Sequence, residues 1–140
     1  MYSNILVPID PAHGAVAAHI LRVARWMAGK DGRVTILHAI DMPQGYITAQ
    51  IPSEILERHQ QEVRSQVEAL ATAGGADRTL IVQGSAATAI LEQATADGSD
   101  AIVLGSHRPD YRDYLIGSTA ARVVRHAACT VLVERSRATA

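Results

Sequence analysis

The chain has 140 residues and a formal net charge of −1. This length predicts one domain with a substantial core, and the near-neutral charge excludes a basic field that would attract nucleic acid or an anionic membrane. No run of about 18 apolar residues exists, so we expect no membrane insertion, and the N-terminus lacks the basic region of a signal peptide. Cys129 is the single cysteine. We expect it to be a small core residue in a reducing, cytoplasmic compartment.

Apolar runs of strand length alternate with segments of helical periodicity along the whole chain. The expected strands are Ile5–Ile9, Val34–Ile40, Thr79–Val82, Ala101–Leu104 and Thr130–Val133. The expected helices are Ala12–Ala28, Pro52–Thr72, a helix that begins at Gly84–Ser85, and Ser118–Ala127. This order predicts an α/β fold with a single doubly wound parallel sheet, in which ligands bind beyond the carboxyl ends of the strands.

Two details of the helices can be checked against a structure. The second helix is expected to turn an apolar face inward along most of its length, and the last helix to turn two valines inward. The apolar face consists of Ile55, Leu56, His59, Val63, Val67 and Leu70, and the two valines are Val123 and Val124. Asp10 followed by Pro11 predicts an N-cap and first turn for the first helix.

The most informative motif follows the fourth strand. Gly105-Ser106-His107-Arg108 ends that strand, the eight residues 109–116 follow, and Gly117-Ser118-Thr119 opens a helix. Backbone N–H groups and hydroxyls gathered at one point are what a phosphate group needs. The sequence has no Walker A motif, and no glycine-rich dinucleotide motif follows the first strand, so P-loop and Rossmann enzymes are disfavoured. A response-regulator receiver domain needs an aspartate after its third strand, where this chain has Gly84-Ser85, so that class is disfavoured as well.

Four segments carry a resemblance to the universal stress protein family that covers nearly the whole chain. They are Asn4–Asp10, Leu37-His38 with Gly105-Ser106-His107, and Leu115–Val133. The resemblance implies sheet order 3-2-1-4-5, as in the adenine nucleotide alpha hydrolase-like fold, and a dimer. It also implies a stress-response regulator. One branch of the family binds ATP through G-x-x-G, nine residues and G-[ST], and another branch binds no nucleotide. Here Arg108 replaces the second glycine and the spacer is one residue short, which resembles a Gly-Ser-His-Arg-Pro subgroup.

The resemblance implies a site for ATP or AMP, with any Mg²⁺ carried on the phosphates. In it, Pro8, Ile9 and Asp10 face the adenosine moiety, and Ala39 and Ile40 contact the adenine. The residues implied to contact the ribose and phosphates are Gly105, Ser106, His107, Arg108, Gly117, Ser118 and Thr119. Each residue also has a purely structural interpretation. Asp10 and Ser118 would be helix caps, Ala39 and Ile40 core residues, and Gly105 a turn at the end of a strand.

The strand Thr130–Glu134 would form an edge of the sheet, and in the family it pairs with its mate, so we expect a homodimer that can assemble further into a tetramer. We expect no metal site built by the protein and at most slow hydrolysis. Two alternatives stay open. One is a regulatory or assembly module that binds no nucleotide and acts through a protein partner. The other is a hydrolase or phosphotransferase that uses His107 and Asp10.

Overall fold

The computed structural model describes residues 1–41, 50–106 and 117–135. A parallel five-stranded sheet has the order β3-β2-β1-β4-β5, which confirms the predicted fold class and strand order. The strands are β1 (Asn4–Pro8), β2 (Arg33–Ile40), β3 (Arg78–Gln83), β4 (Ala101–Gly105) and β5 (Thr130–Glu134). The helices are the 3-10 turn η1 (Pro11–His13), α1 (Gly14–Ala28), α3 (Ser53–Gly74), α4 (Ala86–Asp97) and α5 (Ser118–His126).

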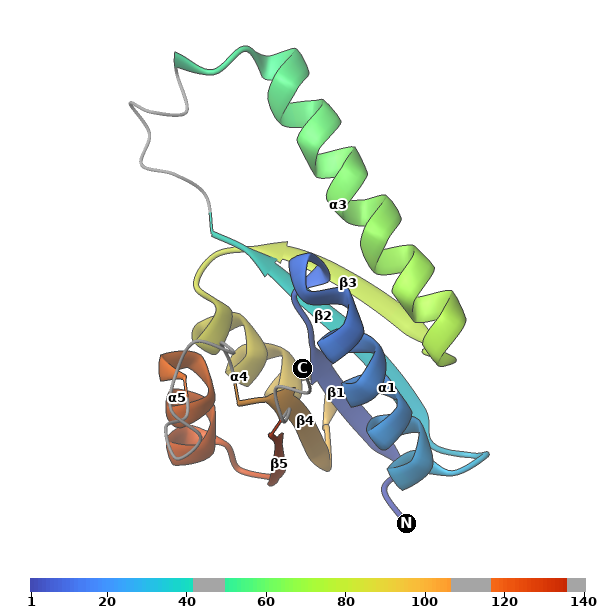
Figure 1. Cartoon of the computed structure of the whole chain (residues 1–140). Helices are drawn as coiled ribbons and strands as arrows, with labels where there is room; N and C mark the ends of the chain where they lie inside the picture. The colour runs from blue at the N-terminus through green and yellow to red at the C-terminus, as the bar shows by residue number, and fades with distance from the viewer. Residues whose placement is uncertain (42–49, 107–116, 136–140) are drawn as a thin grey trace.

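The helices cover both faces of the sheet, α1 and α3 on one and α4 and α5 on the other (Figure 1). Each face has its own aliphatic core, because successive strand residues point to opposite faces. On β4, Ala101 and Val103 belong to the core under α1, whereas Ile102 and Leu104 belong to the core under α4 and α5. Strands buried on both faces explain the continuous apolar runs in the sequence.

The first helical segment begins with a 3-10 turn, which the apolar periodicity does not predict. The Asp10 carboxylate accepts a hydrogen bond from the Ala12 N–H at 2.9 Å, and Pro11 occupies the first helical position. These two residues start the 3-10 turn η1, and α1 proper follows from Gly14. The expectation that Asp10 is an N-cap is therefore confirmed, with a turn of 3-10 helix between the cap and α1.

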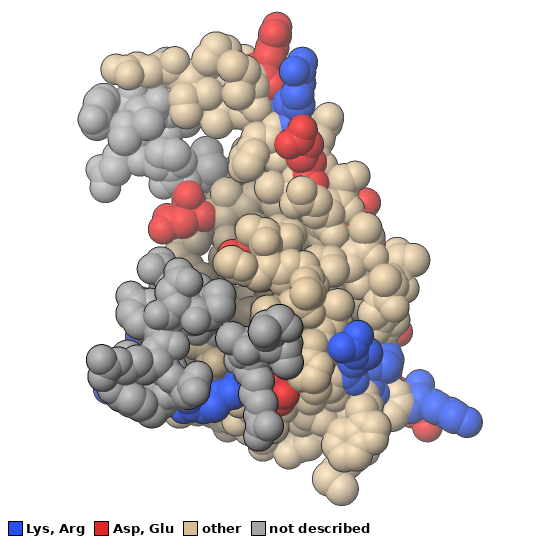
Figure 2. Space-filling view, viewed as in Figure 1, with Lys and Arg blue, Asp and Glu red and all other residues tan. Residues whose placement is uncertain are grey.

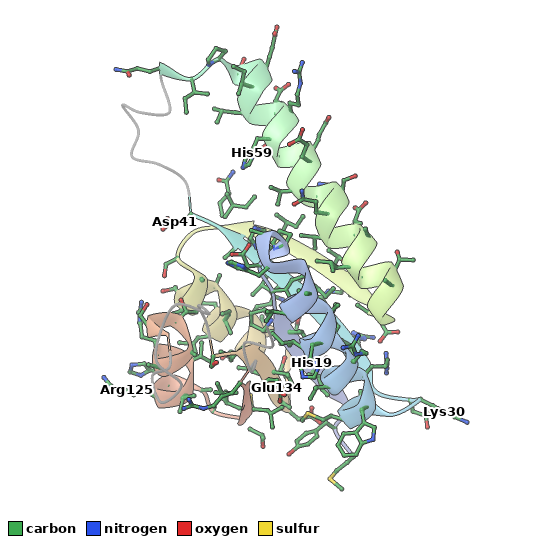
Figure 3. The ribbon with its side chains drawn as sticks, viewed as in Figure 1. His19, Lys30, Asp41, His59, Arg125 and Glu134 are labelled. Atoms are coloured by element: carbon green, nitrogen blue, oxygen red, sulfur yellow. The ribbon has the colours of Figure 1, made fainter. Side chains whose placement is uncertain are left out.

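The N-terminal turns of α3 extend beyond the end of the sheet (Figure 1). Here the predicted apolar face is wrong, because Ile55 is 56% exposed and His59 is exposed on the overhanging part (Figure 3). Acidic and basic side chains alternate on this part of the surface (Figure 2). Further along α3, Val67 is buried and Val63 packs against the core. A helical face becomes a core only where a sheet lies beneath it.

Two side chains on other helices also bear on the packing. Val124 of α5 is 47% exposed, so its predicted inward orientation is wrong, whereas Val123 is fully buried. Neighbouring helical positions differ by about 100° in direction, and this short helix meets the sheet along a single line. On α1, Trp26 is 84% exposed.

The single cysteine, Cys129, precedes β5 and is half-buried against the core under α4 and α5. Burial raises the pKa of its thiol, in keeping with an unreactive packing residue.

Candidate functional site

The carboxyl ends of the central strands meet at one edge of the sheet. Pro8, Ile40 and Gly105 end β1, β2 and β4 there. The strand order reverses between β1 and β4, which pair through Ile5 with Ala101 and Leu6 with Ile102. In open α/β sheets, ligands bind beyond the strand ends at this switch point. The structure therefore brings the predicted residues of β1, β2 and β4 to one edge.

On the β1 side, backbone and side-chain hydrogen bonds hold the turn that follows the strand. The Ile9 N–H donates to the Leu37 carbonyl at 2.9 Å, and the Ile9 carbonyl lies 3.0 Å from Nδ1 of His38. Ile9 itself is buried in the α1 core. The exposed Asp10 carboxylate caps η1 and stands 3.9 Å from His13, so its position is fixed by the local fold.

On the β4 side, one hydrogen bond brings the start of α5 to the end of the strand. The Gly117 N–H donates to the Ser106 carbonyl at 2.8 Å, and the buried Ser106 donates its own N–H to Glu134 of β5 at 3.0 Å. The N-cap of α5 is Gly117, and among the described residues no side chain caps this helix. The expectation that Ser118 caps α5 is therefore wrong.

The absence of a side-chain cap leaves polar groups of the first turn for other partners. Ser118 is exposed and Thr119 is half-buried. The first N–H groups of a helix have no partners within the helix and carry a partial positive charge. The arrangement can therefore accept an anion beside the end of β4.

Gly105 is required for packing, and not only for a turn at the strand end. A Cβ atom on this residue would lie 2.9 Å from Cδ1 of Ile20, which is buried in the α1 core, and 3.7 Å from Cγ1 of Val16. Helix α1 thus approaches the last residue of β4 closely.

The remaining predicted residues divide into two groups. Ala39 and Ile40 are half-buried at the end of β2, where they pair with Val82 and Gln83 of β3. His107 and Arg108 lie outside the described residues, together with the rest of the segment 107–116. Within residues 1–41, 50–106 and 117–135, no group of three or more His, Cys, Asp or Glu side chains could hold a metal ion.

Two contacts near the site are not predicted from the sequence. One is the bond between His38 and Ile9, although Leu37-His38 is among the residues that carry the family resemblance. The other joins Nε2 of His19 on α1 to the Glu134 carboxylate at the end of β5, at 2.9 Å (Figure 3). Partners separated by 115 residues leave no periodic signal in a sequence.

In the described part of the chain, no helix is long and apolar enough to cross a membrane.

Comparison with known proteins agrees with this architecture. Universal stress protein G of Escherichia coli O157:H7 is 29% identical over 142 aligned positions, which cover 96% of this chain and 100% of the relative. The solved structure of universal stress protein UspA from Lactobacillus plantarum matches 96% of this chain and 98% of its own, with a TM-score of 0.69 and 28% identity. A universal stress protein from Archaeoglobus fulgidus in complex with dAMP matches 94% and 97% with a TM-score of 0.64 and 23% identity. The model of the universal stress protein family matches residues 1–135, and the chain belongs to that family.

Proposed function

We propose that this protein binds an adenine nucleotide, ATP or AMP, at the carboxyl edge of its sheet. The observation that carries the proposal is the 2.8 Å bond from the Gly117 N–H to the Ser106 carbonyl, which puts the start of α5 beside the end of β4. The dAMP complex of the Archaeoglobus fulgidus protein, which has the same fold, supports an adenine nucleotide as the ligand class.

The two sides of the edge would hold different parts of the nucleotide. The N–H groups of α5 and the hydroxyls of Ser118 and Thr119 would bind the phosphates, and Gly105 would leave room for the ribose. Pro8, Ile9, Ala39 and Ile40 would surround the base. Ser106, His107 and Arg108 complete the proposed phosphate side, and any Mg²⁺ would bind to the phosphates.

We further propose a sensor or regulator with at most slow hydrolysis. The carboxylate of Asp10 already accepts the Ala12 N–H, so it is a cap whose position suits binding better than proton transfer. As an edge strand, β5 has one side open to pair with a second copy, which supports a homodimer through Thr130–Glu134. A cytoplasmic location and a role in the stress response belong to the same proposal.

The test begins with the freshly purified protein. Denaturation and mass spectrometry would identify any nucleotide that the protein carries, and calorimetry would then measure binding of ATP with Mg²⁺ and of AMP. We expect saturable binding that Gly117→Val abolishes or weakens about tenfold or more. Because Gly117 has φ −64 and ψ 159, valine can adopt its backbone, and a loss of affinity reports the close approach of ligand.

The double variant Ser118→Ala, Thr119→Val tests the hydroxyls, and we expect it to weaken ATP binding more than AMP binding. Thr95→Val is the matched control, because the Thr95 hydroxyl donates to the Leu91 carbonyl of its own helix, α4, and to no other described residue. The proposal is contradicted if the purified protein releases no nucleotide and binds neither ATP nor AMP at millimolar concentration. That result would favour the second candidate, a module that acts through a protein partner, which Arg108 and the short spacer support on sequence grounds.

A further inference from the structure

The pairing between β1 and β2 stops one hydrogen bond earlier than the two strands would allow. The last paired residues are Pro8 and Leu37, and the Ile9 N–H still donates to the Leu37 carbonyl at 2.9 Å. In a parallel ladder the next bond runs from the Ala39 N–H to the Ile9 carbonyl. Instead, the Ile9 carbonyl takes its bond from Nδ1 of His38, at 3.0 Å.

The direction of the Ala39 backbone follows from its neighbours. The Leu37 carbonyl faces β1, where it accepts from Ile9, and the Ile40 carbonyl faces the β3 side, where it accepts from Gly84 at 2.9 Å. Because backbone groups alternate in direction along a strand, Ala39 presents its N–H and carbonyl toward β1. Among the described residues, no hydrogen bond joins the Ala39 N–H to the Ile9 carbonyl. Within the described part of the chain, the Ala39 N–H donor and the Ala39 carbonyl acceptor therefore have no partner and face the edge that forms the candidate site.

We infer that His38 is a positioning residue that holds the Ile9 carbonyl and so keeps the Ala39 N–H and carbonyl available to the base of the nucleotide. This inference rests on the proposed function. Adenine offers an acceptor at N1 beside a donor at its exocyclic amine, which complements one N–H and one carbonyl. Guanine presents a carbonyl and an N–H in the reverse order, so the same pair disfavours it.

The chemistry of the contact fixes which ring nitrogen carries the proton. A carbonyl oxygen can only accept, so Nδ1 of His38 must be the donor, and Nε2 is the acceptor of the neutral ring. Nitrogen-15 shifts of the His38 ring should therefore report the Nδ1–H tautomer in the wild-type protein. A bare Nδ1 would overturn the inference without any substitution.

His38→Val tests the role in the protein without nucleotide. Valine suits a strand but cannot donate, so the Ile9 carbonyl becomes free to accept the Ala39 N–H and extend the ladder. We expect amide exchange of Ala39 to slow about tenfold or more relative to wild type. His38→Asn keeps a short side-chain donor and should leave this exchange unchanged. Unchanged exchange in His38→Val would overturn the inference.

The matched control is Thr35→Val, which places the same side chain on the same strand. Thr35 is 1% exposed, and its hydroxyl has no hydrogen-bond partner among the described residues. This variant should keep wild-type Ala39 exchange and wild-type AMP affinity. A general effect of valine in β2 would instead appear in both variants, and that result would also overturn the inference.

AMP and GMP titrations then measure the consequence. We expect His38→Val to weaken AMP binding about tenfold or more while its melting temperature stays equal or rises, and His38→Asn to bind as wild type does. A purely structural role would lower the melting temperature with the affinity. If wild type binds AMP and His38→Val binds it equally well, the inference fails. If wild type binds no AMP, the proposed function fails, and Ala39 exchange still decides the role of His38.

Discussion

The two ends of the sheet are built differently. At the amino end, one side chain ties several segments together. The guanidinium of Arg25 donates to the carbonyls of Gly29, Gly32 and Gly75 and to the Asp77 carboxylate, which joins the end of α1 to the turns before β2 and β3. At the carboxyl end, the N-termini of η1 and α5 flank the edge, and no side chain of residues 1–41, 50–106 or 117–135 caps α5.

A second group of bonds reinforces the amino end. The Asp100 carboxylate accepts the N–H groups of Ser3 and Asn4 at 2.7 and 3.0 Å, and the Asn4 amide donates to the Asp97 carbonyl at 2.7 Å. Arg78 pairs with the Asp97 carboxylate at 3.1 Å. Polar groups at the amino end thus bond to one another, whereas at the carboxyl end the Ala39 backbone and the first N–H groups of α5 have no hydrogen-bond partner within the described residues. If the proposed function holds, stability and ligand binding are separated along the strands.

The largest effect is expected from Arg25→Ala, which removes four donors at once. We expect a loss of about 2–3 kcal/mol in the free energy of unfolding, measured by urea denaturation, because three carbonyls and a carboxylate lose charged partners. AMP affinity should stay within about twofold of wild type, since the change lies at the opposite end of the sheet. Arg22→Ala, an exposed arginine on the same helix, is the control. A loss of AMP binding in Arg25→Ala alone would break the comparison.

Gly105→Ala tests the carboxyl end, where packing and binding meet. The added methyl group would crowd Cδ1 of Ile20, so we expect a loss of about 1–2 kcal/mol in stability. Because the displaced backbone also borders the site, nucleotide affinity should fall as well. The double variant Gly105→Ala, Ile20→Val should recover stability, which denaturation curves would show. Lost stability with full affinity would remove Gly105 from the proposed site.

The smallest effect concerns the dependence of stability on pH. The Val34 N–H, bonded at 2.8 Å, and then Arg25 lower the pKa of Asp77 below its ordinary value of 3.8. The native state thus binds this proton less readily than the unfolded state, so the stabilisation is complete above that value. It disappears as the pH falls through the lower native pKa.

Asp77→Asn should therefore destabilise the protein by less than about 1 kcal/mol at pH 7, because the carboxylate is half-exposed and water screens its charge. The difference from wild type should shrink as the pH falls below 3.8 and disappear once the pH lies below the lowered native pKa of Asp77, as followed by denaturation at several pH values. Asp31→Asn, at an exposed turn, is the control. A difference that persists in acid would mean that Asp77 acts through shape and not through charge.

The fold follows from sequence because its signals are local. Continuous apolar runs predict strands buried on both faces, and the Asp10-Pro11 pair predicts where the first helical segment starts. The strand order and the position of the site at the edge come from the family resemblance and the general rule for α/β sheets. The failures at Ile55 and Val124 share one cause. Periodicity describes a helix alone, and burial depends on whether a sheet lies beneath it.

The site is predicted less completely, since its hydrogen bonds join distant residues. The reason for glycine at 105 is Ile20 of α1, and the reason for histidine at 38 is the Ile9 carbonyl. Neither partner is marked by spacing or by residue type. The N-cap of α5 is Gly117, whose N–H bonds to the Ser106 carbonyl, and no local pattern encodes that bond.

The exposure of Trp26 has a practical consequence for spectroscopy. It is the only tryptophan in the chain, and with 84% of its surface in water it will emit much as free indole does, whether the chain is folded or not. It lies in the last turns of α1, at the end of the sheet opposite the candidate site. The emission of Trp26 will thus stay unchanged during both unfolding and nucleotide titration. A blue shift will report instead any macromolecule that covers the outer face of α1.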